Sequence, residues 1–206
     1  MQYEYLNVEK VRKSTFSAFI GFVINMIIAS VILYIWKGKD LPNYLLSIFT
    51  VESVVETLGL ALISVILALF CIWIGIILKY ISFPRNKYTE EILVIIKQPY
   101  GPVLISFGAG ISEEILFRGA IFGVLLTSLD NFTAIVLTAL IFTFIHIPQY
   151  GKNLLFNTII ALLGVLFSFL YVYTNSLLAP MVAHILYNYV ICLWIKNGYL
   201  KLKNTN

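Results

Sequence analysis

Long runs of apolar residues alternate with short polar segments along most of the chain. A helix that crosses a bilayer needs about 20 mainly apolar residues, and six runs are close to or above that length. They predict spans at residues 16–36, 57–78, 103–128, 132–147, 154–173 and 176–195. The predicted fold class is therefore all-α, a polytopic transmembrane helix bundle of about six spans.

The connections between these spans carry expectations of their own. Segment 37–53 is interpreted as a polar connection, whereas the alternation of apolar and charged positions over 88–97 predicts a short interfacial helix. A proline removes a backbone hydrogen-bond donor from a helix. We therefore expect Pro148 to end the fourth span and Pro180 to bend the sixth.

Small and polar residues inside the spans indicate where helices approach one another. Gly108 and Gly110 form one small patch in the third span, and Gly119 and Gly123 form a Gly-x-x-x-Gly pair. Such residues let membrane helices pack closely, and a polar side chain can hydrogen-bond across the contact. Asn25, in the first span, is interpreted as a contact of this kind.

Composition supports a membrane protein. The 206-residue chain is 60% hydrophobic and 12% charged, with a mean hydropathy of +0.93. The net charge of +4 comes largely from Lys and Arg that flank the spans, and no basic stripe interleaved with aromatic residues is present, so nucleic acid is excluded as a partner. Cys71 and Cys192 fall in predicted spans without a Cys-x-x-Cys spacing, so neither a disulfide nor a thiolate metal site is predicted.

The distribution of basic residues predicts the orientation. With six spans both termini lie on one side, and 11 of the 14 Lys and Arg residues then fall on that side. The positive-inside rule makes that side cytoplasmic. We expect a multi-pass protein of the cell membrane, with residues 1–206 forming a single membrane domain whose motif-bearing core is about 102–195. Residues 1–101 would supply N-terminal scaffold spans and a cytoplasmic loop.

Three ionisable residues lie within the third span, in the sequence Ile-Ser-Glu-Glu-Ile-Leu-Phe-Arg-Gly. A charge near the centre of a bilayer costs about 2.5–3.5 kcal/mol on insertion scales, so such residues are usually paired or functional. Glu114 and Arg118 are four residues apart and share a helix face, so they can form an ion pair. Glu113 points about 100° away from Glu114 and is predicted to be the freer carboxylate.

Both histidines of the chain also fall in predicted spans. His146 ends the fourth span, and Phe142 lies four residues earlier on its face. His184 lies in the sixth span with Asn188 four residues later. Counted at about 1.5 Å per residue from the span ends, Glu113, His146, His184 and Asn188 are all expected in the cytoplasmic half of the bilayer.

This set of groups suits hydrolysis. A carboxylate can remove a proton from water, and imidazole and amide groups can stabilise the oxyanion of a tetrahedral intermediate. The chain has no Gly-x-Ser-x-Gly elbow and no His-Glu-x-x-His zinc helix. A water nucleophile is the remaining interpretation, with or without a metal.

The ordered segments Glu-Glu-Ile-Leu-Phe-Arg, Phe-Thr-Phe-Ile-His and His-Ile-Leu-Tyr-Asn resemble the three motifs of the CAAX-protease and bacteriocin-processing family of intramembrane endopeptidases. The resemblance covers about residues 102–195 and implies a membrane protease that cuts a peptide or protein near the cytoplasmic face. It implies that Glu113 is the general base, helped by His146, and that His184 and Asn188 hold the oxyanion. Glu114 and Arg118 would order the first motif.

The resemblance leaves a cofactor open. The family is often described as metalloproteases, and Glu113, His146 and His184 offer donor types that suit zinc. The sequence alone does not commit the chain to a metal.

Two other functions are compatible with the sequence. The first is an immunity or interaction protein on the same fold that acts by binding a bacteriocin rather than by cutting it. The second is a small ion-coupled transporter, because intramembrane Glu, Arg and His also line ion paths. No repeat between the two halves of the chain, of the kind that transporters often have, is visible in the sequence.

Overall fold

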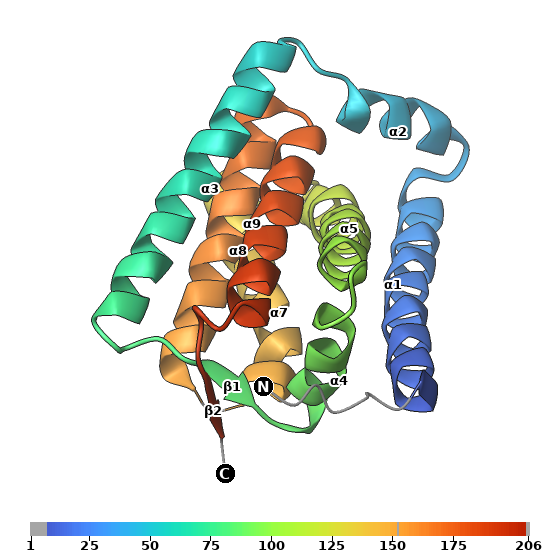
Figure 1. Cartoon of the computed structure of the whole chain (residues 1–206). Coiled ribbons are helices and arrows are strands. Elements are labelled where there is room, and N and C mark those ends of the chain that lie inside the picture. Colours follow the sequence, from blue (N-terminus) through green and yellow to red (C-terminus); the bar gives the residue numbers. More distant parts are fainter. Residues whose placement is uncertain (1–7, 152, 205–206) are drawn as a thin grey trace.

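The computed structural model describes residues 8–151 and 153–204, and it is all-α apart from one pair of three-residue strands (Figure 1). The elements in chain order are α1 (Val8–Lys37), η1 (Gly38–Asp40), α2 (Leu41–Phe49), α3 (Val54–Ile77), β1 (Phe83–Arg85), α4 (Lys87–Ile96), α5 (Gly101–Glu114), η2 (Ile115–Phe122), α6 (Gly123–Leu125), α7 (Asn131–Tyr150), α8 (Leu154–Thr174), α9 (Leu178–Lys196) and β2 (Leu202–Asn204).

Five helical segments of the described chain are long and apolar enough to cross a membrane. They are Val8–Phe49, which includes α1 and α2, and the single helices α3, α7, α8 and α9. These segments confirm a multi-pass membrane protein. The span predicted at 103–128 is built from α5, η2 and α6 in direct succession, and because none of these pieces alone reaches 18 residues it stays a prediction.

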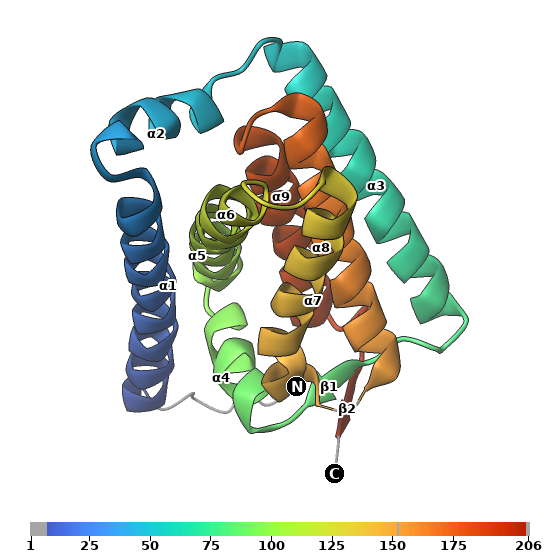
Figure 2. The same cartoon turned by 180° about the vertical axis from the view of Figure 1, so that it is seen from behind.

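The bundle has two outer helices and a packed centre. In Figures 1 and 2, α1 and α3 stand at opposite edges, α2 crosses one end of the molecule, and α5, α7, α8 and α9 lie between them. Helix α1 packs on α5, η2 and α4, whereas α3 packs on α9 and α8. The core between them includes an edge-to-face pair of Phe117 and Phe142, with ring centroids 4.9 Å apart.

The short strands close the end of the molecule opposite α2 (Figure 1). Strands β1 and β2 are parallel, and Phe83 pairs with Leu202. The backbone N–H of Phe83 donates to the carbonyl of Lys201 at 2.8 Å. Leu200, just before β2, is buried against Phe83, Leu93 and Phe156. The segment after α9 is thereby held against the α3–α4 connection.

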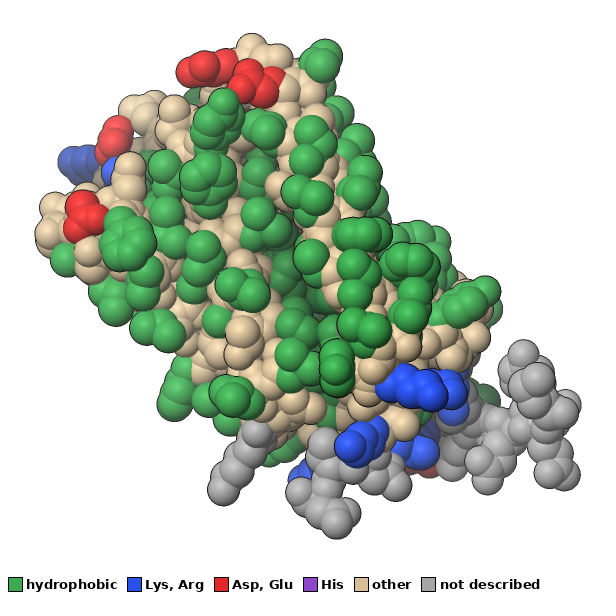
Figure 3. Space-filling model, turned by 90° about the vertical axis from the view of Figure 1, so that its left-hand side faces the viewer, with side chains coloured by type: hydrophobic (Ala, Val, Ile, Leu, Met, Phe, Trp, Pro, Cys, Tyr) green, Lys and Arg blue, Asp and Glu red, His purple; other side chains and the backbone are tan. Residues whose placement is uncertain are grey.

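Charges gather at the two ends of the molecule. Figure 3 shows a face whose middle is covered by hydrophobic side chains, with mainly Lys and Arg at one end, and Asp and Glu together with a smaller basic group at the other. Many large apolar side chains of α1 and α3 are exposed, among them Ile35 and Val55. An apolar belt between charged ends is the arrangement that a bilayer requires.

Several local predictions need correction. Segment 37–53, which was interpreted only as a polar connection, contains the helices η1 and α2. Pro148 does not end the fourth span: α7 continues to Tyr150, since the residues after the proline still find acceptors, as Gly151 N does at Ile147 O (2.6 Å). Pro180 lies in the first turn of α9, where a missing N–H removes no intrahelical hydrogen bond. It is therefore not expected to bend the helix, contrary to the prediction. The short helix predicted at 88–97 is confirmed as α4.

Candidate active site

The acidic motif lies where α5 passes into a π-helix. Glu113 and Glu114 form the last turn of α5, and Arg118 lies in η2. Because consecutive helical residues point about 100° apart, the two carboxylates enter different surroundings. The side chain of Glu114 is completely buried, whereas that of Glu113 is 14% exposed.

Glu114 and Arg118 form the predicted ion pair. Arg118 Nη1 donates to Glu114 Oε1 at 3.0 Å, and Nη2 and Nε reach the carbonyl of Gly164 (2.8 Å) and the hydroxyl of Ser168 (3.4 Å) on α8. The guanidinium carbon also lies 5.0 Å from the ring centroid of Phe142, within the range of a cation–π contact. A buried guanidinium with three polar partners ties the first motif to α8.

Tyr44 supports the π-helix from outside the motif. Its hydroxyl, on α2, donates a 2.6 Å hydrogen bond to the carbonyl of Gly119, the residue that follows Arg118. Gly123 is close by: a Cβ there would meet the Tyr44 hydroxyl at 2.6 Å and the Trp36 ring at 2.8 Å. π-Helical turns are frequently found at functional sites. No periodic signal in the sequence reveals this contact, because its partners are 75 residues apart.

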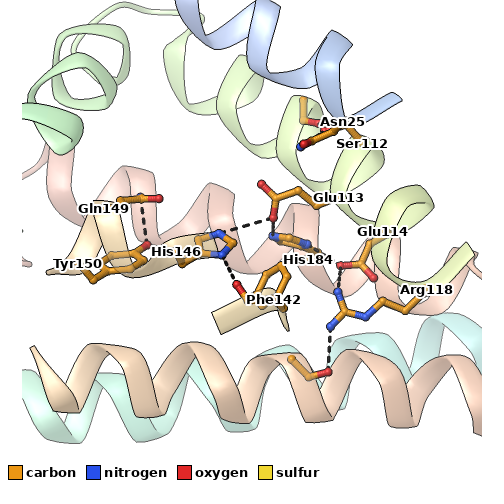
Figure 4. A network of polar contacts seen from close by, with 12 residues as sticks. Asn25, Ser112, Glu113, Glu114, Arg118, Phe142, His146, Gln149, Tyr150 and His184 are labelled. Atoms are coloured by element: carbon orange, nitrogen blue, oxygen red, sulfur yellow. Dashed lines mark hydrogen bonds and ion pairs between the residues drawn. The ribbon is translucent and has the colours of Figure 1, made fainter. Parts of the chain in front are cut away.

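Each histidine uses one ring nitrogen to bind an acceptor. His146 Nδ1 lies 2.7 Å from the carbonyl oxygen of Phe142, and His184 Nδ1 lies 2.7 Å from Glu114 Oε1 (Figure 4). A carbonyl and a carboxylate oxygen only accept, so we assign the Nδ1–H tautomer to both rings. In a neutral ring the lone pair is then on Nε2.

Both Nε2 atoms face Glu113. Its Oε2 atom lies 3.8 Å from His146 Nε2 and 3.9 Å from His184 Nε2, and Figure 4 shows the three side chains converging from α5, α7 and α9. These distances exceed the 2.7–3.2 Å of a direct hydrogen bond. One water molecule between the Glu113 carboxylate and an imidazole could donate one hydrogen bond to each of them. General-base catalysis requires this arrangement.

A cavity of about 350 Å³ encloses this group. Its walls are mostly apolar, and the carboxylate, imidazole and amide side chains that reach it are those of Asn25, Glu113, His146, Gln149, His184 and Asn188. Asn188 therefore lines the same cavity, one helical turn after His184, but makes no hydrogen bond to a described residue. Gln149 is a cavity residue that the motif reading missed, although it lies three residues after His146 on the same helix.

The proposed zinc ligands are near one another but do not form a metal site as they stand. Imidazole nitrogen and carboxylate oxygen are suitable donors. Within residues 8–151 and 153–204, however, no group of three or more His, Cys, Asp or Glu side chains has the arrangement needed to hold a metal ion. Glu113, His146 and His184 therefore stay a hypothetical ligand set.

Comparison with known proteins relates the motif-bearing half of the chain to a protein family. Residues 95–190 match the family described as type II CAAX prenyl endopeptidase Rce1-like. The chain is also 30% identical over 161 residues to a Bacillus subtilis (strain 168) protein described as "Putative membrane peptidase YdiL". The matched region covers 73% of this chain and 64% of the relative. The chain thus spans less than two thirds of that relative's length, and no solved structure matches it. The resemblance drawn from the three motifs is confirmed by the match of residues 95–190 to the Rce1-like type II CAAX prenyl endopeptidase family.

Proposed function

We propose that this protein is an intramembrane endopeptidase that hydrolyses a peptide bond near the cytoplasmic face of the membrane. The observation that carries the proposal is the position of Glu113, whose Oε2 atom faces the Nε2 atoms of His146 and His184 at 3.8 and 3.9 Å inside a largely apolar cavity. The match of residues 95–190 to a family of endopeptidases supports the same conclusion. The substrate is a peptide or protein that reaches the cavity from the bilayer.

In the proposed mechanism Glu113 is the general base. Glu113 removes one proton from a water molecule, whose other O–H donates a hydrogen bond to His146 Nε2. The water oxygen then attacks the carbonyl carbon of the scissile peptide bond. The tetrahedral intermediate then collapses, the C–N bond breaks, and the proton held by Glu113 passes to the leaving nitrogen. The second water proton stays on the acyl oxygen, so the products are a peptide with a new carboxyl group and a peptide with a new amino group.

Stabilisation of the oxyanion falls to Asn188 and His184. The side-chain NH2 group of Asn188 is always a hydrogen-bond donor, because the amide does not titrate. His184 Nε2 can donate only when the ring is an imidazolium, because its Nδ1–H is already held by Glu114 at 2.7 Å. Asn188 is therefore the more direct oxyanion donor of the two.

Comparing membrane peptides tests the proposal. Cells producing the protein are compared with cells producing Glu113→Ala or His146→Ala at matched protein levels, and peptides in the membrane fraction are identified by mass spectrometry. We expect at least one processed peptide to disappear in both variants. Identical peptide sets in all three strains would overturn the proposal, and immunity to a bacteriocin that survives Glu113→Ala would indicate a binding role instead.

A further inference from the structure

Asn25 brings an amide to the reaction centre from outside the family segment. It lies on α1, whereas the family match covers residues 95–190. Between Ala18 and Ile35 it is the one side chain of α1 that carries an amide or a charge. Of the residues of α1, only Ser14, Ala29 and Leu33 are buried. An amide without compensating hydrogen bonds is costly in hydrocarbon, so its position calls for a partner.

The contacts of Asn25 leave most of its amide uncommitted. Its Nδ2 lies 3.5 Å from Ser112 Oγ, at the outer limit of a hydrogen bond, while Ser112 Oγ donates to the carbonyl of Gly108 at 2.7 Å. Among the described residues, no other group hydrogen-bonds to Asn25. The second Nδ2 hydrogen and the Oδ1 acceptor are thus free to bind a ligand.

The position of this amide is well defined. Phe22, one turn earlier, packs directly against Gly108, and a Cβ on Gly108 would lie 2.1 Å from the Phe22 ring. Ala18, Gly21, Phe22 and Asn25 share one face of α1, and all four line the cavity that holds Glu113. Figure 4 shows Asn25 next to Ser112, which immediately precedes Glu113. The close contact of the Phe22 ring with Gly108 therefore holds the Asn25 amide at the wall of the cavity that contains Glu113.

We propose that Asn25 binds the backbone of the substrate, at the peptide group next to the bond that is cut. A primary amide presents a donor and an acceptor side by side, which matches the N–H and C=O of an extended peptide. Successive peptide groups are about 3.3–3.6 Å apart along an extended chain, so a substrate held at Glu113 brings its neighbouring group toward Ser112 and Asn25. This inference rests on the proposed endopeptidase function and assigns α1 a substrate-binding role.

Photo-crosslinking tests the inference apart from catalysis. A diazirine amino acid is placed at position 25, 30 or 149 in the full chain carrying Glu113→Gln, which retains substrate without cutting it. Position 149 lies on the cavity wall and serves as the positive control, and Ser30 is an exposed residue of the same helix. Captured peptides are identified by mass spectrometry from membranes of the producing cells.

Each pattern of capture has one meaning. Capture at positions 25 and 149, but not at 30, supports the inference. Capture at 149 without capture at 25 overturns it and leaves the endopeptidase proposal standing. Capture at none of the three positions overturns both, and equal capture at 30 shows contact from the lipid side and also overturns the inference.

A kinetic measurement gives a second, independent readout. With a peptide recovered at position 149 as substrate, Asn25→Leu is expected to raise KM about tenfold, the size of one lost hydrogen bond, while kcat changes less than threefold. Ser30→Leu should leave both constants unchanged. A lower melting temperature for Asn25→Leu with an unchanged KM would show that Asn25 only packs α1 on α5, and the inference would be wrong.

Discussion

His184 Nδ1 lies 2.7 Å from Glu114 Oε1, although 70 residues separate the two in the chain. This bond turns the opposite nitrogen, Nε2, toward Glu113. A completely buried carboxylate thus orients the imidazole, and the adjacent carboxylate faces the cavity beside it. The proposed mechanism therefore gives the two consecutive glutamates separate tasks: Glu114 holds the site together and Glu113 takes part in the reaction.

Substitution of each glutamate separates these tasks. Glu113→Gln removes the base, and we expect a loss of at least about 100-fold in kcat with an unchanged melting temperature. Glu114→Gln leaves Arg118 without its counter-charge and loosens His184, so the melting temperature should fall along with activity. Activity assays on purified protein and thermal unfolding in detergent measure both effects. Equal destabilisation by the two variants would contradict this division.

Arg118 is expected to be the most sensitive charged position for stability. Its side chain is completely buried and reaches Glu114, Gly164 and Ser168. Arg118→Leu leaves a buried carboxylate unpaired, which typically costs about 3–5 kcal/mol. Arg118→Lys should recover only part of that loss, because one ammonium group cannot reproduce a planar fork with several partners.

Lys13 provides the control for Arg118. It pairs with Glu9 on α1 at 2.7 Å, but its side chain is 73% exposed. Exposed pairs of this kind contribute about 0–1 kcal/mol, so Lys13→Ala should unfold almost as the unchanged protein does. Unfolding followed by tryptophan fluorescence in detergent compares the variants. A melting temperature for Arg118→Leu within about 2 °C of the control would contradict the role assigned to Arg118.

Helical spacing predicted part of the site well. The i, i+4 relation between Glu114 and Arg118 corresponds to the observed ion pair, and the separate direction of Glu113 follows from 100° per residue. The same spacing relates His146 to Phe142, but the partner is the backbone carbonyl rather than the ring alone. Local periodicity identifies which residues share a face, not which atoms they use.

Contacts between segments that are distant in the chain could not be predicted from sequence patterns. Helix α2 was missed because it is short and begins with a Pro-Asn pair that is typical of turns, and its Tyr44 hydroxyl finds Gly119 only in the folded bundle. The π-helical turn depends on the same packing. Asn25 could be recognised as an unusual amide in an apolar span, but its place beside Glu113 requires α1 to dock on α5.

Two glycines of the third predicted span should respond differently to alanine. A Cβ on Gly110 would lie 2.5 Å from the Ile185 side chain and 3.1 Å from its backbone nitrogen, so α5 and α9 would have to move apart. A Cβ on Gly119 would meet its nearest neighbours outside its own helix at 3.6 Å or more, in ordinary contact. We expect Gly110→Ala to lower the melting temperature and Gly119→Ala to leave it unchanged or raise it, by removing backbone freedom from the unfolded chain. The opposite order would contradict the tight α5–α9 packing.

Tyr44 should contribute to stability through the hydrogen bond that its hydroxyl donates to the carbonyl of Gly119. Tyr44→Phe keeps the ring but leaves the buried carbonyl of Gly119 without this donor, which costs about 1 kcal/mol. Tyr34, which is 69% exposed on α1, provides a matched Tyr→Phe control that should have no effect. Thermal unfolding of both variants in the same detergent makes the comparison. If Tyr34→Phe and Tyr44→Phe unfold alike, the contact between α2 and the π-helix is not a stabilising one.

The orientation in the membrane is the last expectation, and cysteine labelling tests it. Eleven of the 14 Lys and Arg residues fall on the side predicted to be cytoplasmic, whereas Lys37 and Lys39 lie near α2 at the opposite end. In a Cys71→Ser background, Glu52→Cys and Lys87→Cys place exposed thiols at the two ends of the bundle. A membrane-impermeant maleimide added to intact cells should label Glu52→Cys, and it should label Lys87→Cys only after permeabilisation. The reverse pattern would turn the basic end outward, and the cleavage proposed near the cytoplasmic face would have to be assigned to the other side of the membrane.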